Sequence, residues 1–255
     1  MPPLFSGVGV ALVTIFDDHG AIDAPATADL AAQLTGLGVA AVLVAGTTGE
    51  APALSSAERS TLIRAVRDAV PRDVPVMAGT GAATGRQAVE LTNGAFDAGA
   101  DAALVLSPPW VADPRPYYDA VAKGFPSERL LAYHFPFASA PGIPVEMLAD
   151  LPMAGIKDSS GDAERLVRTV ETFDGDVYVG SSAVLSMAAG VGAAGAILTL
   201  ANLEPERCIA AFGGDGAAQR ALLDSHLAAV QEYPIRLKQL VAERFGVSGA
   251  VRIGR

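Results

Sequence analysis

Short apolar segments alternate with longer amphipathic segments eight times along this 255-residue chain. Each short segment is apolar almost throughout, so both faces of the strand it predicts are expected to be buried, as in a parallel sheet. Eight successive βα units predict a (β/α)8 TIM barrel, and a doubly wound open sheet is the weaker alternative. The predicted strands are 8–16, 40–45, 74–79, 102–106, 130–135, 155–158, 177–180 and 195–200.

Helices are expected between these strands, and several carry start signals. Ser55 with Glu58 and Thr84 with Gln87 have capping-box spacing, and Asp113 precedes a first-turn proline. The predicted helices are 24–36, 56–69, 85–98, 114–123, 144–151, 162–172, 182–190 and 205–212.

A glycine-rich break at 213–216 ends the alternation. Beyond it, 217–232 and 235–245 are predicted as two helices separated at Pro234. We therefore expect a barrel domain over 1–213 and a short C-terminal helical extension over 214–255.

Composition narrows the class of protein. The net charge of −10 disfavours nucleic-acid binding, and no apolar stretch is long enough to span a bilayer. The single cysteine, Cys208, cannot form an internal disulfide, and 8–16 lacks the basic leader of a signal peptide, so a cytoplasmic protein is expected. The three histidines fall in different elements and no nucleotide-binding glycine motif follows the first strand. No metal and no cofactor are therefore expected.

Lysine is scarce, with three residues against 15 arginines. Lys123 and Lys238 fall on helix patterns and are interpreted as solvated surface charges. Lys157 instead falls inside a predicted barrel strand, where burial lowers the pKa of an amine and makes it nucleophilic. A structural ion pair with Asp158 is the alternative interpretation.

Tyr133 lies on the strand before the one that carries Lys157. Its phenol is a candidate acid or base at the barrel mouth. A strand tyrosine by itself is more often a packing residue, and the neighbouring lysine strand gives the two interpretations equal weight. The neighbouring His134 is expected on the opposite, outer face of the strand.

Two loop regions after strands are further candidates. The segment 46–50, Gly-Thr-Thr-Gly-Glu, offers hydroxyls and backbone amides that suit a carboxylate or phosphate, or it is an ordinary βα turn. The segments 180–182 and 200–202 occupy the quarter of a barrel that often binds phosphate, and an ordinary helix start is equally compatible.

Four segments in order resemble the dihydrodipicolinate synthase / N-acetylneuraminate lyase family of class I aldolases: 46–50, the Tyr133-x-x-Pro136 motif, 155–158 and 195–198. The resemblance implies a TIM barrel that assembles as a homo-oligomer, a tetramer or a dimer. It implies that Lys157 forms a Schiff base with pyruvate or another 2-keto acid and that Tyr133 shuttles the proton. It further implies that Thr47 and Thr48 hold the keto-acid carboxylate and that Ile197 supplies a backbone contact.

The chain also departs from the synthases of that family. No phenol stands in 107–110, where the synthases carry a tyrosine pair, and no arginine stands in 137–142, where they bind the second substrate. The C-terminal helical region is also shorter than is usual in the family. These differences favour an aldolase or hydratase-aldolase that acts on 2-keto-3-deoxy sugar acids, with an aldehyde as the second partner. The alternatives are a synthase with a rearranged second pocket, a catalytically idle keto-acid-binding paralogue, and a phosphate-binding barrel isomerase.

Overall fold

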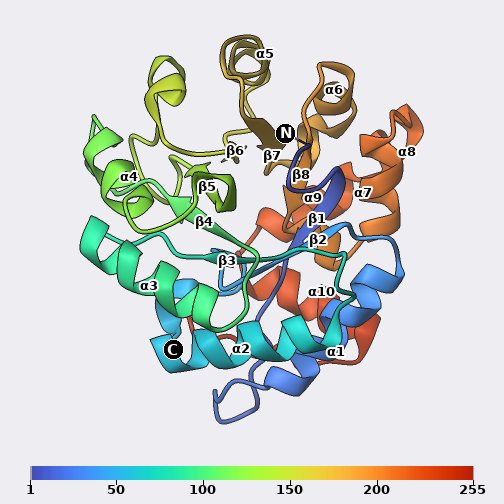
Figure 1. The fold of residues 1–255 in the computed structure, drawn as a ribbon. Helices are drawn as coiled ribbons and strands as arrows, with labels where there is room; N and C mark the ends of the chain where they lie inside the picture. Colours follow the sequence, from blue (N-terminus) through green and yellow to red (C-terminus); the bar gives the residue numbers. More distant parts are fainter. Residues whose placement is uncertain (1, 255) are drawn as a thin grey trace.

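The computed structural model describes residues 2–254 and contains a closed barrel of eight parallel strands in chain order, surrounded by helices (Figure 1). Strand β1 pairs with both β2 and β8, with Gly9 opposite Ala41 on one side and Ile197 on the other, which closes the barrel. The predicted TIM barrel is therefore confirmed. The strands are β1 Gly7–Ala11, β2 Ala41–Val44, β3 Val76–Gly79, β4 Ala102–Leu106, β5 Leu130–His134, β6 Gly155–Asp158, β7 Asp176–Val179 and β8 Gly195–Leu198.

The helices that connect the strands, together with α7 after the last strand, cover the outside of the barrel. They are α1 Ala24–Gly36, α2 Ser56–Ala69, α3 Gly85–Asp97, α4 Arg115–Ala122, α5 Ala163–Thr172, α6 Leu185–Gly190 and α7 Pro205–Phe212. Short 3-10 helices are η1 Ala51–Ala53, η2 Ser127–Arg129, η3 Val145–Asp150, η4 Ser182–Val184 and η5 Leu200–Asn202. The capping box at Ser55 and Glu58 is present in full.

The first strand is shorter than the apolar segment 8–16 predicts. The amide of Leu12 still donates to the Leu43 carbonyl at 2.9 Å, but after it side chains replace the neighbouring strands as acceptors for the backbone. The amide of Val13 donates to Asn202 Oδ1 at 3.0 Å, and the amide of Ile15 donates to Thr27 Oγ1 at 3.0 Å. These bonds satisfy buried backbone groups without extending the ladder.

Two predicted helices also differ in form. The segment 144–151 is the 3-10 helix η3 rather than an α-helix. The segment 217–232 divides into α8 Gly216–Ala221 and α9 Leu223–Val230, with the buried Leu222 at the junction. Helix α10, Ile235–Phe245, follows as predicted.

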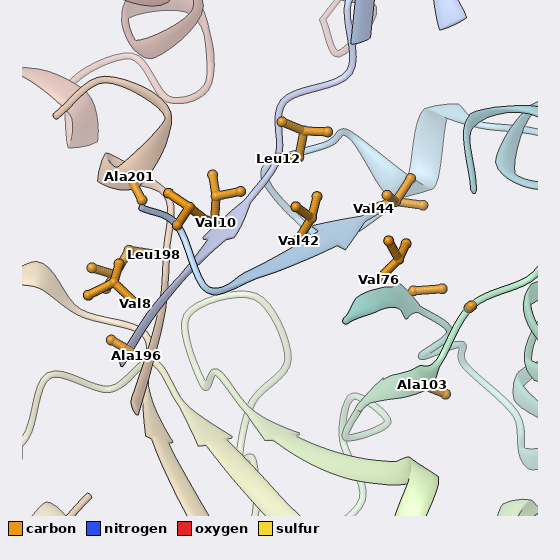
Figure 2. Close-up of a cluster of buried hydrophobic side chains, with 14 of the residues drawn as sticks. Val8, Val10, Leu12, Val42, Val44, Val76, Ala103, Ala196, Leu198 and Ala201 are labelled. Carbon is orange, nitrogen blue, oxygen red and sulfur yellow. The ribbon is translucent and has the colours of Figure 1, made fainter. Parts of the chain in front are cut away.

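Alternation along the strands produces two apolar layers. Val8 and Val10 on β1, with Leu12 directly after it, share the outer layer with Val42 and Val44 (Figure 2). This layer packs against the helices. The inner layer fills the barrel and includes Leu43, Met77, Leu104, Leu131, Tyr133, Tyr178 and Ile197.

The C-terminal extension contacts the rest of the molecule at several points. Arg252 donates to Glu58 Oε1 of α2 at 2.6 Å, so the last described residues lie beside that helix (Figure 1). The division of the chain at residues 213 and 214 into a barrel and an extension stays a prediction. Among residues 2–254, no helix is both long enough and apolar enough to cross a bilayer.

Candidate active site

A cavity of about 590 Å³ opens at the carboxyl ends of the barrel strands. Its walls come from the ends of β5, β6 and β8, from the loops after β2 and β7, and from the C-terminal extension. This is the end of a barrel at which active sites are built, and the volume suits a small metabolite.

Lys157 lies in the wall of this cavity, as predicted. It stands on β6 in register with Tyr133 on β5 and Tyr178 on β7, and only 4% of its surface is exposed. Burial lowers the pKa of the amine from its ordinary value to about 7. A large fraction of the amine is therefore neutral and nucleophilic at physiological pH.

The alternative interpretation, an ion pair between Lys157 and Asp158, is wrong. The Asp158 carboxylate pairs with Arg165 instead, with 2.5 Å between Oδ2 and Nε. Consecutive strand residues point to opposite faces, so Asp158 faces the helix layer while Lys157 faces the cavity.

Tyr133 places its aromatic ring beside this amine. The Lys157 Nζ lies 4.5 Å from the centre of the Tyr133 ring. Burial raises the pKa of the Tyr133 phenol, while hydrogen bonds with Ser159 and Thr47 act in the opposite direction. The phenol is thus protonated at neutral pH and available as a proton donor beside the amine. As predicted, the neighbouring His134 points away from the cavity, where its Nδ1 accepts from the amide of Ile143 at 2.8 Å.

The loop that follows β2 brings both predicted threonines to the cavity. Thr48 Oγ1 lies 2.8 Å from Thr199 Oγ1, which follows β8. The loop is packed tightly, because a Cβ on Gly49 would lie 3.0 Å from the Leu12 carbonyl oxygen. Glu50 ends the loop in a left-handed conformation with φ of 56°, which an L-residue adopts only when its surroundings hold it.

Lys238 does not lie on the surface, which corrects the interpretation of its helix pattern. It is buried with its Nζ 2.8 Å from Glu50 Oε1, and the Glu50 side chain is also buried. Residues Leu237 and Val241 of α10 are buried with it, so this lysine belongs to the inward face of the helix. Lys123, by contrast, is exposed as predicted.

Three residues that the sequence did not single out also line the cavity: Thr199, His226 and Tyr233. His226 Nδ1 lies 2.8 Å from Ser182 Oγ, and burial lowers the pKa of its imidazole. His226 and Tyr233 belong to the C-terminal extension, whose approach to the barrel has no signal in the local sequence.

Neither Ile197 nor Trp110 lines the cavity. Ile197 is buried in the barrel interior, while the next residue, Leu198, lines the cavity. The backbone contact expected from Ile197 stays a prediction. Trp110, in the segment 107–110 that lacks a phenol, is 91% exposed. Among residues 2–254, no group of three His, Cys, Asp or Glu side chains is arranged to hold a metal ion.

Comparison with known proteins agrees with this geometry. The family described as "Dihydrodipicolinate synthetase family" matches residues 4–248. The chain belongs to this family. A 4-hydroxy-tetrahydrodipicolinate synthase from Synechococcus sp. is 37% identical over 239 residues, which cover 88% of this chain and 79% of the relative.

Solved structures support the same assignment. A dihydrodipicolinate synthase from Bacillus anthracis has a TM-score of 0.92 at 28% identity, covering 100% of this chain and 93% of that one. A dihydrodipicolinate synthase from Acinetobacter baumannii, complexed with pyruvate, has a TM-score of 0.90 at 27% identity, covering 99% and 92%. As a member of the dihydrodipicolinate synthetase family, the chain is a lyase of the class I aldolase type.

Proposed function

We propose that this lyase makes or cleaves a carbon–carbon bond of a 2-keto acid such as pyruvate through a Schiff base at Lys157. The observation that carries the proposal is the buried Lys157 amine, with a pKa of about 7, in the wall of a cavity beside Tyr133. The structure of the relative complexed with pyruvate supports pyruvate as the keto acid.

The chemistry follows from these two residues. The neutral Lys157 amine attacks the keto carbon, and the keto oxygen leaves as water after it accepts one proton from the attacking amine and one from Tyr133. The protonated imine takes up the electron pair of the C3–C4 bond as that bond breaks, while the Tyr133 phenolate accepts the proton of the C4 hydroxyl, which gives an enamine and an aldehyde. The reverse reaction forms that bond. Thr47 and Thr48 are proposed to hold the carboxylate, and Ile197 to contact the substrate through its backbone.

The polar lining of the cavity favours a 2-keto-3-deoxy sugar acid as the substrate. Ser160, Ser181, Ser182 and His226 supply neutral polar groups to it. Among the described residues that line the cavity, Lys157 is the single one with an ammonium or guanidinium group. Neutral hydroxyl groups suit the polyol chain of a sugar acid better than a second carboxylate, for which a guanidinium is the usual partner.

The second candidate is condensation of pyruvate with an amino-acid semialdehyde in a rearranged second pocket. It is favoured by the names of the relatives, several of which are 4-hydroxy-tetrahydrodipicolinate synthases. Pyruvate release from a panel of 2-keto-3-deoxy sugar acids, measured beside pyruvate consumption with the semialdehyde, separates the two reactions. Activity with the semialdehyde alone would rule out the sugar-acid assignment.

The imine itself is tested by borohydride reduction in the presence of pyruvate, followed by intact mass and peptide mapping. We expect one reduced pyruvyl group on Lys157 and none on the Lys157→Ala variant. An unmodified wild-type protein would contradict the Schiff-base mechanism and would favour the idle, keto-acid-binding alternative.

The assembly of the chain is also part of this proposal. We infer a homo-oligomer of two or four copies in a reducing, cytoplasmic environment, and light scattering in solution measures the copy number. Cys208 is buried, and burial raises the pKa of its thiol to about 12, so it is poorly placed to form an intermolecular disulfide.

A further inference from the structure

Three hydroxyl groups from distant parts of the chain meet at the side of the cavity that carries the threonine loop. Tyr233 lies between α9 and α10 and lines the cavity together with Thr48 and Thr199. The two threonine hydroxyl oxygens are 2.8 Å apart, and both threonines lie close enough to the Tyr233 phenol to lower its pKa. The cluster joins the loop after β2, the end of β8 and the C-terminal extension.

The Tyr233 phenol is protonated at neutral pH. Burial raises its pKa to about 12, while the two threonine hydroxyls act in the opposite direction. The side chain is still 36% exposed, so the ring reaches into the cavity from its rim. A protonated phenol beside two alcohols forms a set of neutral hydrogen-bond donors, which suits a bound anion better than a cation.

A buried ion pair near Tyr233 holds its segment against the threonine loop. Lys238 lies one helical turn after Pro234, with its amide donating to the Pro234 carbonyl at 3.1 Å. Its ammonium pairs with Glu50, two residues after Thr48 in the same loop. The segment that presents Tyr233 and the loop that presents Thr48 are therefore connected directly by a buried ion pair.

We propose that Tyr233 is a substrate-binding residue that donates a hydrogen bond to the carboxylate of the 2-keto acid, together with Thr48. This inference rests on the proposed function, because it takes the keto carbon to Lys157. The carboxylate and keto carbons of a 2-keto acid are directly bonded, so the carboxylate has to lie in the same cavity, close to the imine. The hydroxyl cluster supplies donors there, and Tyr133 remains free for proton transfer.

The decisive experiment measures the initial rate of pyruvate trapping by borohydride against pyruvate concentration, for the wild type and for Tyr233→Phe. We expect the half-saturating concentration of pyruvate to rise about tenfold in the variant, with little change in the limiting rate, because a charge-assisted hydrogen bond is lost. With pyruvamide, whose amide is neutral, the half-saturating concentration should be nearly the same for both proteins.

Tyr117→Phe is the matched control. Burial raises the pKa of the Tyr117 phenol to about 12 as well, but its hydroxyl donates to the Leu106 carbonyl outside the set of residues that line the cavity. Its trapping curve should follow the wild type. If Tyr233→Phe does not fold, Thr199→Val removes another hydroxyl of the cluster and carries the same expectation.

An unchanged half-saturating concentration for pyruvate would overturn the inference. If the limiting rate fell at the same time, Tyr233 would be assigned to proton transfer instead. If the wild type itself forms no adduct, the Schiff-base proposal fails. Calorimetry then compares pyruvate binding to Lys157→Ala with pyruvate binding to the double variant Lys157→Ala/Tyr233→Phe. Equal affinities would reject the contact between Tyr233 and the carboxylate.

Discussion

The ammonium of Lys238 lies 2.8 Å from the carboxylate of Glu50, and both side chains are buried. This contact joins two residues 188 positions apart, one on α10 and one at the end of the threonine loop. The other Glu50 oxygen accepts from the backbone amides of Arg252 and Ile253. The C-terminal extension is thus attached to the loop that faces the cavity through one carboxylate.

Replacing Lys238 with methionine should destabilise the protein strongly, because the Glu50 carboxylate would stay buried without its partner. We expect a loss of about 3–5 kcal/mol in the free energy of unfolding, measured by urea denaturation. The double variant Glu50→Gln/Lys238→Met should recover part of that loss, because no unpaired charge remains. Arg86→Met, which breaks an exposed pair with Glu90, is the control and should leave the midpoint nearly unchanged.

Imine formation should accelerate as the pH rises through about 7, because the neutral Lys157 amine is the nucleophile and its pKa is about 7. Initial rates of pyruvate trapping across this range should rise and then level off above the pKa. A rate that is already maximal well below neutral pH would contradict the lowered pKa.

The same pKa makes the stability of the fold depend on pH. In the unfolded chain Lys157 titrates near its ordinary value of 10.5, so between about 7 and 10.5 the unfolded state binds more protons than the folded state. Stability should therefore rise with pH across this window. Between pH 7 and pH 10.5 the free energy of unfolding of the wild type should rise by about 4 kcal/mol relative to that of Lys157→Met. Lys123→Met, at an exposed position, should show no such difference.

The parts of the site that the sequence predicts are those that depend on strand alternation and strand order. Lys157 and Tyr133 lie on consecutive parallel strands, so their register follows from the barrel itself. The positions of Lys238 and Tyr233 depend on how the C-terminal extension packs against the barrel. Neither the helix pattern around Lys238 nor the Tyr-Pro sequence at 233–234 predicts that packing. The end of β1 differs from the prediction for a related reason, because its ladder stops where the side chain of Asn202 provides an acceptor.

Tyr133→Phe should retain the cavity and lose the proton donor. We expect the rate of imine formation to fall by about two to four orders of magnitude, with unfolding stability changed little, because the lost hydroxyl makes its hydrogen bonds within the cavity. Trapping time courses and urea denaturation measure the two quantities. A rate near that of the wild type would exclude Tyr133 as the proton donor.

Gly180 at the end of β7 provides the last prediction, because its lack of a side chain leaves room for Lys157. A Cβ at this position would lie 1.8 Å from Ser159 Oγ and 2.9 Å from Lys157 Cε. The Ser159 hydroxyl and the Lys157 chain can rotate away, but the new Cβ would also lie 2.8 Å from Ser159 Cβ, so Gly180→Ala should fold only with a shift of Ser159 as a whole and of the Lys157 side chain. Since Ser159 also hydrogen-bonds with Tyr133 at 3.4 Å, the change displaces both groups that carry the reaction. We expect imine formation to slow by at least about tenfold, as misplacement of reacting groups commonly causes. Gly190→Ala, where a Cβ meets nothing within 4 Å, is the matched control and should trap pyruvate at the wild-type rate. An equal rate in the two variants would show that Lys157 does not need the space beside Gly180.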